Sequence, residues 1–282
     1  MTATTPKKRL SPKARAELER AFATLERSIF ATLLSRLTFG ATDRTAKTPP
    51  AAVAWIAKKA VSPLLATALS VAVRTLGAGD KSVEGPVARY LYKAIVALSG
   101  ATGGAAGLPG LLAELPLTTV LMLRRIAEVA RRNGEDLSDP ATRLACLEVF
   151  ALSGIGAVPK AIGSTYYAAR IALHGTIAQA TRELSGAGGR LAGRAFSGLV
   201  SKIAAKFGAD VARLAASRLV PIAGAASGAI LSTLFMDYYQ EVAEAHFTIR
   251  RLERKYGTDI VQKAYERLRE KRNSVTVIVG CR

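Results

Sequence analysis

Residues 94–123 read AIVALSGATGGAAGLPGLLAELPLTTVLML and contain one charged side chain, Glu114. Glycine and alanine recur here at intervals of four residues, which places them on one helix face and lets two helix backbones approach closely. A second run, residues 219–236, is also free of charge and has small residues at the same spacing. The two runs predict helices that pack together through small residues. The glycines expected at that contact are Gly100, Gly103, Gly104, Gly107, Gly224 and Gly228.

Both uncharged runs come close to the length of about 20 residues that a helix needs to cross a bilayer. Pro109 and the glycines around it oppose a straight membrane-spanning helix in the first run. The second run is rich in alanine and glycine, so its insertion into lipid is only weakly favourable. Three interpretations stay open: close packing inside a helical bundle, a hairpin or interfacial segment in the membrane, and a glycine hinge.

The rest of the chain is also typical of helices. Of its 282 residues, 52 are alanine and half are hydrophobic, whereas clusters of β-branched residues are scarce. Helix starts are indicated at Ser11-Pro12, Pro116 and Asp139-Pro140, and a helix end at Asn133-Gly134. The exception is VTVIV at residues 275–279, which is predicted to be an edge strand or disordered. We therefore expect an all-α fold, an alanine- and glycine-rich helical bundle.

The distribution of charge and of helix-breaking glycine and proline residues divides the chain into three parts, which we expect to form one domain. These are basic N-terminal helices over residues 1–84, a helical core over 85–256, and a basic C-terminal helix with a short tail over 257–282. The polar start of the chain is not followed by an apolar segment, which argues against a secretion signal. Two cysteines, Cys146 and Cys281, are too few for a disulfide framework. We expect a protein of the reducing cytoplasm, with Cys146 in the core.

The net charge of +19, from 40 basic and 21 acidic residues, lies mainly towards the two ends of the chain. Anionic lipid headgroups attract a nearby basic side chain by about 1 kcal/mol, and tyrosines at the edges of both uncharged runs match an interfacial belt. A solvated basic surface is the alternative, and nucleic acid is less favoured because acidic residues are interleaved and no nucleic-acid-binding motif is present. The candidate lipid contacts are Lys7, Lys8, Arg9, Lys13, Arg15, Tyr90, Tyr92, Tyr238, Tyr239, Arg250, Arg251 and Arg254.

The sequence carries no recognised catalytic motif. It lacks a GxSxG elbow, a complete phosphate loop and the Glu-x-x-His spacing of di-iron sites. The polar residues that lie within apolar segments are Glu114, Arg124, Glu128 and His246. Arg124 and Glu128 are four residues apart, so we expect them to pair on one helix face. No catalytic residue, metal or cofactor is assigned.

Two blocks of the sequence resemble the EcsC family of bacterial proteins. The first block combines residues 103–109 (GGAAGLP), 114–118 (ELPLT), 123–127 (LRRIA) and 133–136 (NGED), and the second combines 220–225 (VPIAGA), 245–247 (AHF) and 250–252 (RRL). Together they bracket most of the chain. The resemblance implies a link to membranes, because the family is named after a product encoded with an ABC transporter, and it implies no catalytic residues.

We therefore predict a membrane-associated helical protein that binds anionic lipid of the inner membrane, or a partner linked to an ABC transporter, without chemistry. The expected location is the cytoplasmic face of the inner membrane, or the cytoplasm. One alternative is a hydrolase of lipid-like substrates, with Glu114, Arg124 and Glu128 as its polar centre, and another is a soluble scaffold. Partition between cytosol and membranes, before and after washes with high salt and alkaline carbonate, distinguishes inserted, peripheral and cytosolic proteins.

Overall fold

The computed structural model describes residues 9–26, 67–68, 71, 86–105, 107–152, 166–186, 193–218 and 224–279. Within these ranges the regular structure is helical and no strand occurs, which confirms the predicted all-α fold. The helices are α1 (Pro12–Glu26), α5 (Pro86–Ala105), α6 (Gly107–Arg132), α7 (Pro140–Leu152), α8 (Tyr166–Gly186), α9 (Arg194–Arg218), α10 (Gly224–Tyr256) and α11 (Thr258–Val279).

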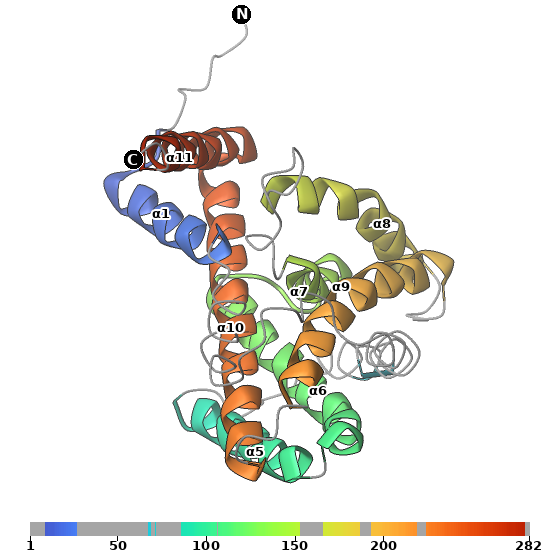
Figure 1. Ribbon diagram of the computed structural model, residues 1–282. Coiled ribbons are helices and arrows are strands. Elements are labelled where there is room, and N and C mark those ends of the chain that lie inside the picture. The colour runs from blue at the N-terminus through green and yellow to red at the C-terminus, as the bar shows by residue number, and fades with distance from the viewer. Residues whose placement is uncertain are drawn as a thin grey trace, which may run out of the picture.

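Helix α10 is the axis of the described fold. Its 33 residues give it a length of about 50 Å at 1.5 Å per residue. Helix α5 crosses one end of α10, whereas α1 and α11 pack at the other end (Figure 1). Helix α6 packs on α5 and α10, and α7, α8 and α9 pack together beside them. The two ends of α10 therefore lie in different surroundings.

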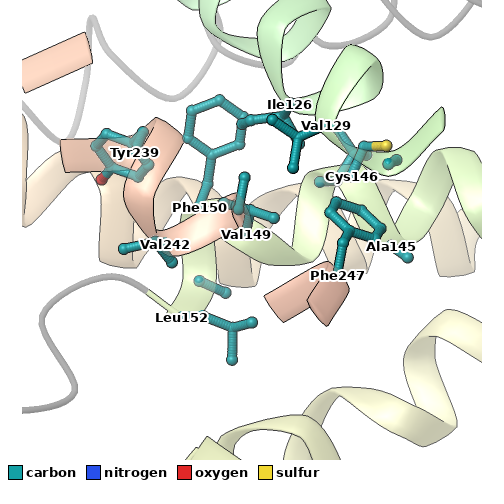
Figure 2. Packing of buried hydrophobic residues seen from close by; sticks show 14 of the residues in the cluster. Ile126, Val129, Ala145, Cys146, Val149, Phe150, Leu152, Tyr239, Val242 and Phe247 are labelled. Atoms are coloured by element: carbon teal, nitrogen blue, oxygen red, sulfur yellow. The ribbon is translucent and has the colours of Figure 1, made fainter. Parts of the chain in front are cut away.

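Helix α7 lies at the centre of the core. Every residue from Leu144 to Leu152 is buried, because α6, α8, α9 and α10 all pack against this helix. Burial all round is what a helix without a polar face requires. The ring centroid of Phe150 lies 5.0 Å from that of Phe207 and 5.1 Å from that of Tyr239. Figure 2 draws Phe150 and Tyr239 in this core. Cys146 is buried in the same core cluster, as predicted for a core cysteine (Figure 2).

Several predicted helix boundaries are confirmed. The Ser11 hydroxyl accepts a hydrogen bond from the Ala14 amide at 3.2 Å, and the Asp139 carboxylate accepts one from the Ala141 amide at 2.9 Å. Both are N-cap contacts that satisfy a free amide of the first turn. Helix α6 ends just before Gly134, which has a φ of 77° and so adopts the left-handed conformation of a C-terminal cap.

Two predictions about local structure are wrong. Helix α6 begins at Gly107 and contains Pro116, which was expected to start it. The neighbouring residues Glu114, Leu115 and Thr118 are buried in the core. Their burial compensates for the loss of the backbone hydrogen bond that a proline inside a helix removes. Residues 275–279 belong to α11 and form no strand. A strand needs a partner for its backbone groups, whereas a continuing helix satisfies them internally.

The cap at Gly134 gives a testable difference between two substitutions. Asparagine tolerates a positive φ, whereas a β-branched residue does not. A Cβ at Gly134 would meet only the Arg254 side chain, at an ordinary contact distance of 3.7 Å. A difference in stability between the two variants would therefore not arise from steric clash at the Cβ. We expect Gly134→Val to lower the free energy of unfolding by about 1–2 kcal/mol more than Gly134→Asn. Urea unfolding followed by circular dichroism measures this, and equal losses would contradict it.

Candidate functional site

The two uncharged runs of the sequence meet at one end of the fold. The first run lies on α5 and the first half of α6, and the described part of the second, residues 224–236, lies on the first half of α10. Among the described pairs of helices, α5 and α10 make the most extensive contact, and both also pack on α6. Gly100 is buried on α5. The other five glycines expected at this contact lie outside the described side chains, so their role stays a prediction.

This apolar end, formed by α5 and the first halves of α6 and α10, exposes large hydrophobic side chains. Tyr90 is 72% exposed and Leu98 69% exposed, and they lie with Ala94 at intervals of four residues, on one stripe of α5. Leu117 of α6 and Ile230 of α10 are exposed as well. Of the six large hydrophobic side chains that are exposed in the described part of the chain, four therefore lie at this end.

Tyr238 and Tyr239 are not part of that exposed surface. They are 5% and 0% exposed, so the prediction that they contact lipid is wrong. Tyr239 packs against Phe150, Phe207 and Phe235, so this face of α10 points towards the core. Tyr92 lies on α5, but its side chain falls outside the described ones.

Two polar contacts connect the helices of the apolar end. The Lys93 ammonium lies 2.7 Å from the Asp237 carboxylate and joins α5 to α10. The Ser232 hydroxyl donates a hydrogen bond of 2.6 Å to the buried carboxylate of Glu114 and joins α10 to α6. Buried polar groups are normally paired, because burying a polar group without a hydrogen-bond partner lowers the stability of the fold. The contact with Ser232 therefore gives Glu114 a structural role.

The polar centre expected for a hydrolase is not formed. Glu128 pairs with Arg125 in place of the expected Arg124, because Arg125 is the buried member of the two arginines. Glu114 lies fourteen residues before Glu128 on the same helix, which separates them by about 21 Å along its axis. The predicted pairing of Arg124 with Glu128 is wrong, and Glu114, Arg124 and Glu128 do not form one site.

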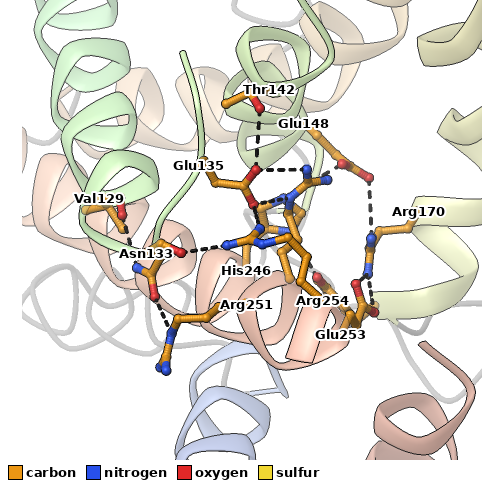
Figure 3. A network of polar contacts seen from close by, with 12 residues as sticks. Val129, Asn133, Glu135, Thr142, Glu148, Arg170, His246, Arg251, Glu253 and Arg254 are labelled. Atoms are coloured by element: carbon orange, nitrogen blue, oxygen red, sulfur yellow. Dashed lines mark hydrogen bonds and ion pairs between the residues drawn. The ribbon is translucent and has the colours of Figure 1, made fainter. Parts of the chain in front are cut away.

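The basic cluster of α10 is bound within the protein. Arg250 donates to the Glu135 carboxylate at 2.8 Å, and Arg254 also pairs with Glu135 (Figure 3). Arg251 donates to the side chain of Asn133 at 3.1 Å and lies 3.1 Å from a carboxylate oxygen of Glu17. These three arginines were predicted to contact lipid. Their charges are largely offset by the loop after α6 and by α1.

A second group of ionisable side chains lies deeper, where α7, α8 and α10 meet (Figure 3). His246 is 0% exposed, and its Nδ1 lies 2.9 Å from the Tyr166 hydroxyl. Its Nε2 has no hydrogen-bond partner and lies 3.8 Å from Oε2 of Glu148. Arg170 donates to both carboxylate oxygens of Glu253, at 2.7 and 3.0 Å. We call Glu148, His246, Tyr166, Arg170 and Glu253 the central cluster.

Two buried glutamates have shifted pKa values in opposite directions. Burial acts against the charge of Glu135, but the hydrogen bonds and charges of Arg250 and Arg254 outweigh it and hold the pKa of Glu135 below its ordinary value. Burial raises the pKa of Glu148 to about 7, and the positive charges of Arg170 and Arg250 only partly oppose that rise. Burial, together with the same two arginines, lowers the pKa of His246. This histidine is therefore neutral.

Sequence reasoning identified His246 but missed the residues that meet it. Glu148 carried a readable signal, because it is the lone charged residue between Arg143 and Lys160. Arg170 and Glu253 gave none, since they lie more than eighty residues apart and their pairing depends on the fold.

Among the proposed lipid contacts, Arg9, Lys13 and Arg15 are exposed, and Arg15 pairs with Glu19 at 3.3 Å. Lys7 and Lys8 lie outside the described residues.

Two features do not occur in the part of the chain that the structure describes. In the described ranges, no three histidine, cysteine, aspartate or glutamate side chains gather as metal ligands would. None of the described helices combines the length and the apolarity needed to cross a membrane.

Comparison with known proteins gives one match. The model of the EcsC protein family matches residues 12–252, which is most of the chain. No curated protein and no solved structure matches the chain. The match covers the apolar end and all of the central cluster except Glu253, which lies one residue beyond it.

Proposed function

This chain belongs to the EcsC protein family, and we propose that it binds the surface of an anionic membrane through its apolar end, without catalysing a reaction. The observation that carries the proposal is the exposed stripe of Tyr90, Ala94 and Leu98 on α5, with Leu117 and Ile230 on the adjoining helices. Exposed apolar side chains gathered in one place are typical of a surface that another phase or molecule covers.

Charge favours a bilayer over a second copy of the chain as the occupant of this surface. Each copy carries a net charge of +19, so two copies repel each other, whereas an anionic membrane attracts the protein. The apolar end would then hold the attracted protein at the interface, with its side chains at the boundary of headgroups and acyl chains. We place the protein at the cytoplasmic face of the inner membrane, where it would meet a transporter-linked partner.

The basic residues at the start of α1 and just before it have a different role in this proposal. Helix α1 packs near the end of α10 opposite to α5, so Arg9, Lys13 and Arg15 do not lie beside Leu98 (Figure 1). They contribute to the long-range attraction, which salt screens. Exposed apolar side chains at the interface are less sensitive to salt, so the two contributions separate in one experiment.

A charge within the apolar stripe tests the proposal. We expect Leu98→Glu to reduce binding to vesicles that contain phosphatidylglycerol by about tenfold or more, because a carboxylate resists transfer into the interface. The matched control is Ile171→Glu on α8. Ile171 is also 69% exposed, but it lies away from the apolar end. Flotation of the purified protein with vesicles measures both variants.

The outcomes separate the possible occupants of the surface. Equal binding by Leu98→Glu and Ile171→Glu would overturn the proposal, as would the absence of binding by the unmodified protein.

Glutamine at Lys7, Lys8 and Arg9 should weaken binding at low salt and have little effect at high salt. If Leu98→Glu instead changes the oligomeric state in solution, the stripe is an interface between copies.

A further inference from the structure

The central cluster suggests a binding site for a proton. We infer that Glu148 and His246 share one proton inside the core, and that this proton connects α7 to α8 and α10. The inference is independent of the proposed membrane binding, because the cluster lies in the interior of the fold, away from the exposed stripe of α5.

The geometry around His246 leaves one position for that proton. Nε2 of His246 is buried without a hydrogen-bond partner and faces Oε2 of Glu148 at 3.8 Å. Nδ1 lies 2.9 Å from the Tyr166 hydroxyl, which can donate to it or accept from it. If Nδ1 carries the ring hydrogen, Nε2 accepts a proton held by Glu148. If the Tyr166 hydroxyl donates to Nδ1, Nε2 carries the ring hydrogen and points it at the carboxylate, which is the arrangement expected after Glu148 has lost the proton.

Burial is the main reason why Glu148 takes up a proton, and the charges around it oppose this only partly. Arg170 of α8 lies 4.0 Å from its carboxylate, but the short contacts of this guanidinium, at 2.7 and 3.0 Å, are with Glu253 of α10. Arg250 of α10 is likewise paired with Glu135. Each nearby cation therefore has an anion of its own. The remaining helices around α7 contribute apolar side chains to its surroundings, such as Ile126 of α6 and Phe207 of α9.

Loss of the proton changes the balance of this cluster. An ionised Glu148 competes with Glu253 for Arg170, and that guanidinium is part of the contact between α8 and α10. The folded pKa of about 7 is higher than the ordinary value of 4.5, so the folded state binds the proton more tightly than the unfolded chain does. The resulting stabilisation is complete below about pH 4.5 and is lost as the pH rises through 7.

We expect the folding equilibrium constant of the protein to fall by about 150-fold through this group between about pH 4.5 and pH 8. Glu148→Gln carries no titrating group and should lose this part of the pH dependence, while its stability near pH 5 stays close to that of the unmodified protein. The matched control is Glu270→Gln, an exposed glutamate of α11, which should keep the full dependence. Urea unfolding at several pH values measures all three proteins.

A second measurement does not depend on whether Glu148→Gln folds. Carbon-13 NMR of the glutamate carboxyl groups in the unmodified protein should show one resonance that titrates near pH 7, whereas exposed glutamates titrate near about 4.3. The inference is overturned if every glutamate carboxyl titrates below about pH 5.5. It is also overturned if folded Glu148→Gln retains the pH dependence of the unmodified protein.

Discussion

Replacing Glu135 by alanine will lower the free energy of unfolding by about 3–5 kcal/mol at neutral pH. The Glu135 side chain is 5% exposed and accepts hydrogen bonds from Arg250 at 2.8 and 3.2 Å. Without it, the Arg250 guanidinium, which is 24% exposed, stays in the protein interior with its main counter-charge removed. Arg254 adds little to this loss, because its side chain is 43% exposed and water can solvate it.

A double-mutant cycle separates the pair from other effects of the substitution. If the cost of Glu135→Ala arises mainly from the stranded charge of Arg250, the double variant Glu135→Ala/Arg250→Ala will lose much less stability than the sum of the two single variants. The control is Arg15→Ala, which breaks the ion pair with Glu19 on the exposed surface of α1 and should cost about 0.5 kcal/mol or less. Additive losses in the cycle would show that Glu135 and Arg250 act independently.

Glu135 and Glu148 respond to pH in opposite ways, although both contribute to the same core. The pKa of Glu135 is lowered in the folded state, so its stabilising effect is present above about pH 4.5 and is lost as the pH falls further. The pKa of Glu148 is raised, so its effect is present at acid pH and is lost as the pH rises through 7. From these two groups, stability is greatest near pH 4.5 and falls on both sides.

Local signals in the sequence predicted much of the fold. The caps at Ser11, Asp139 and Gly134 act within a few residues, so neighbouring residue types are enough to identify them. Small residues at intervals of four in residues 94–123 and 219–236 predicted closely packed helices, with a membrane segment and a hinge as alternatives, and the helices that carry the described parts of these runs do pack on one another. Pattern alone did not specify the partner of each charged residue.

The contacts that sequence reasoning missed are those between distant segments. Glu135 and Arg250 are 115 residues apart, and a basic cluster on a helix looks the same whether it faces solvent, lipid or a buried carboxylate. The same ambiguity affects residues 275–279, where β-branched residues favour a strand but the described helix α11 continues through them. Such cases depend on the three-dimensional partner, which a single sequence does not specify.

A tyrosine at the edge of an uncharged segment can face either the core or a membrane, and the sequence does not distinguish the two. Two variants do. Tyr239→Ala is expected to lower the free energy of unfolding by about 3–5 kcal/mol, because it removes a ring that is 0% exposed and leaves a cavity beside Phe150, Phe207 and Phe235. Tyr90→Ala, at a position that is 72% exposed, should change stability by no more than about 0.5 kcal/mol.

Membrane binding should rank the same two variants in the reverse order. Tyr90→Ala is expected to weaken binding to anionic vesicles by about fivefold, because it removes part of the stripe that would enter the interface. Tyr239→Ala, measured at a temperature where it remains folded, should bind as the unmodified protein does. Urea unfolding and vesicle flotation on the same two preparations test both statements. If Tyr239→Ala weakened vesicle binding while leaving stability unchanged, Tyr239 would face lipid, and the packing of α10 against the core would be wrong.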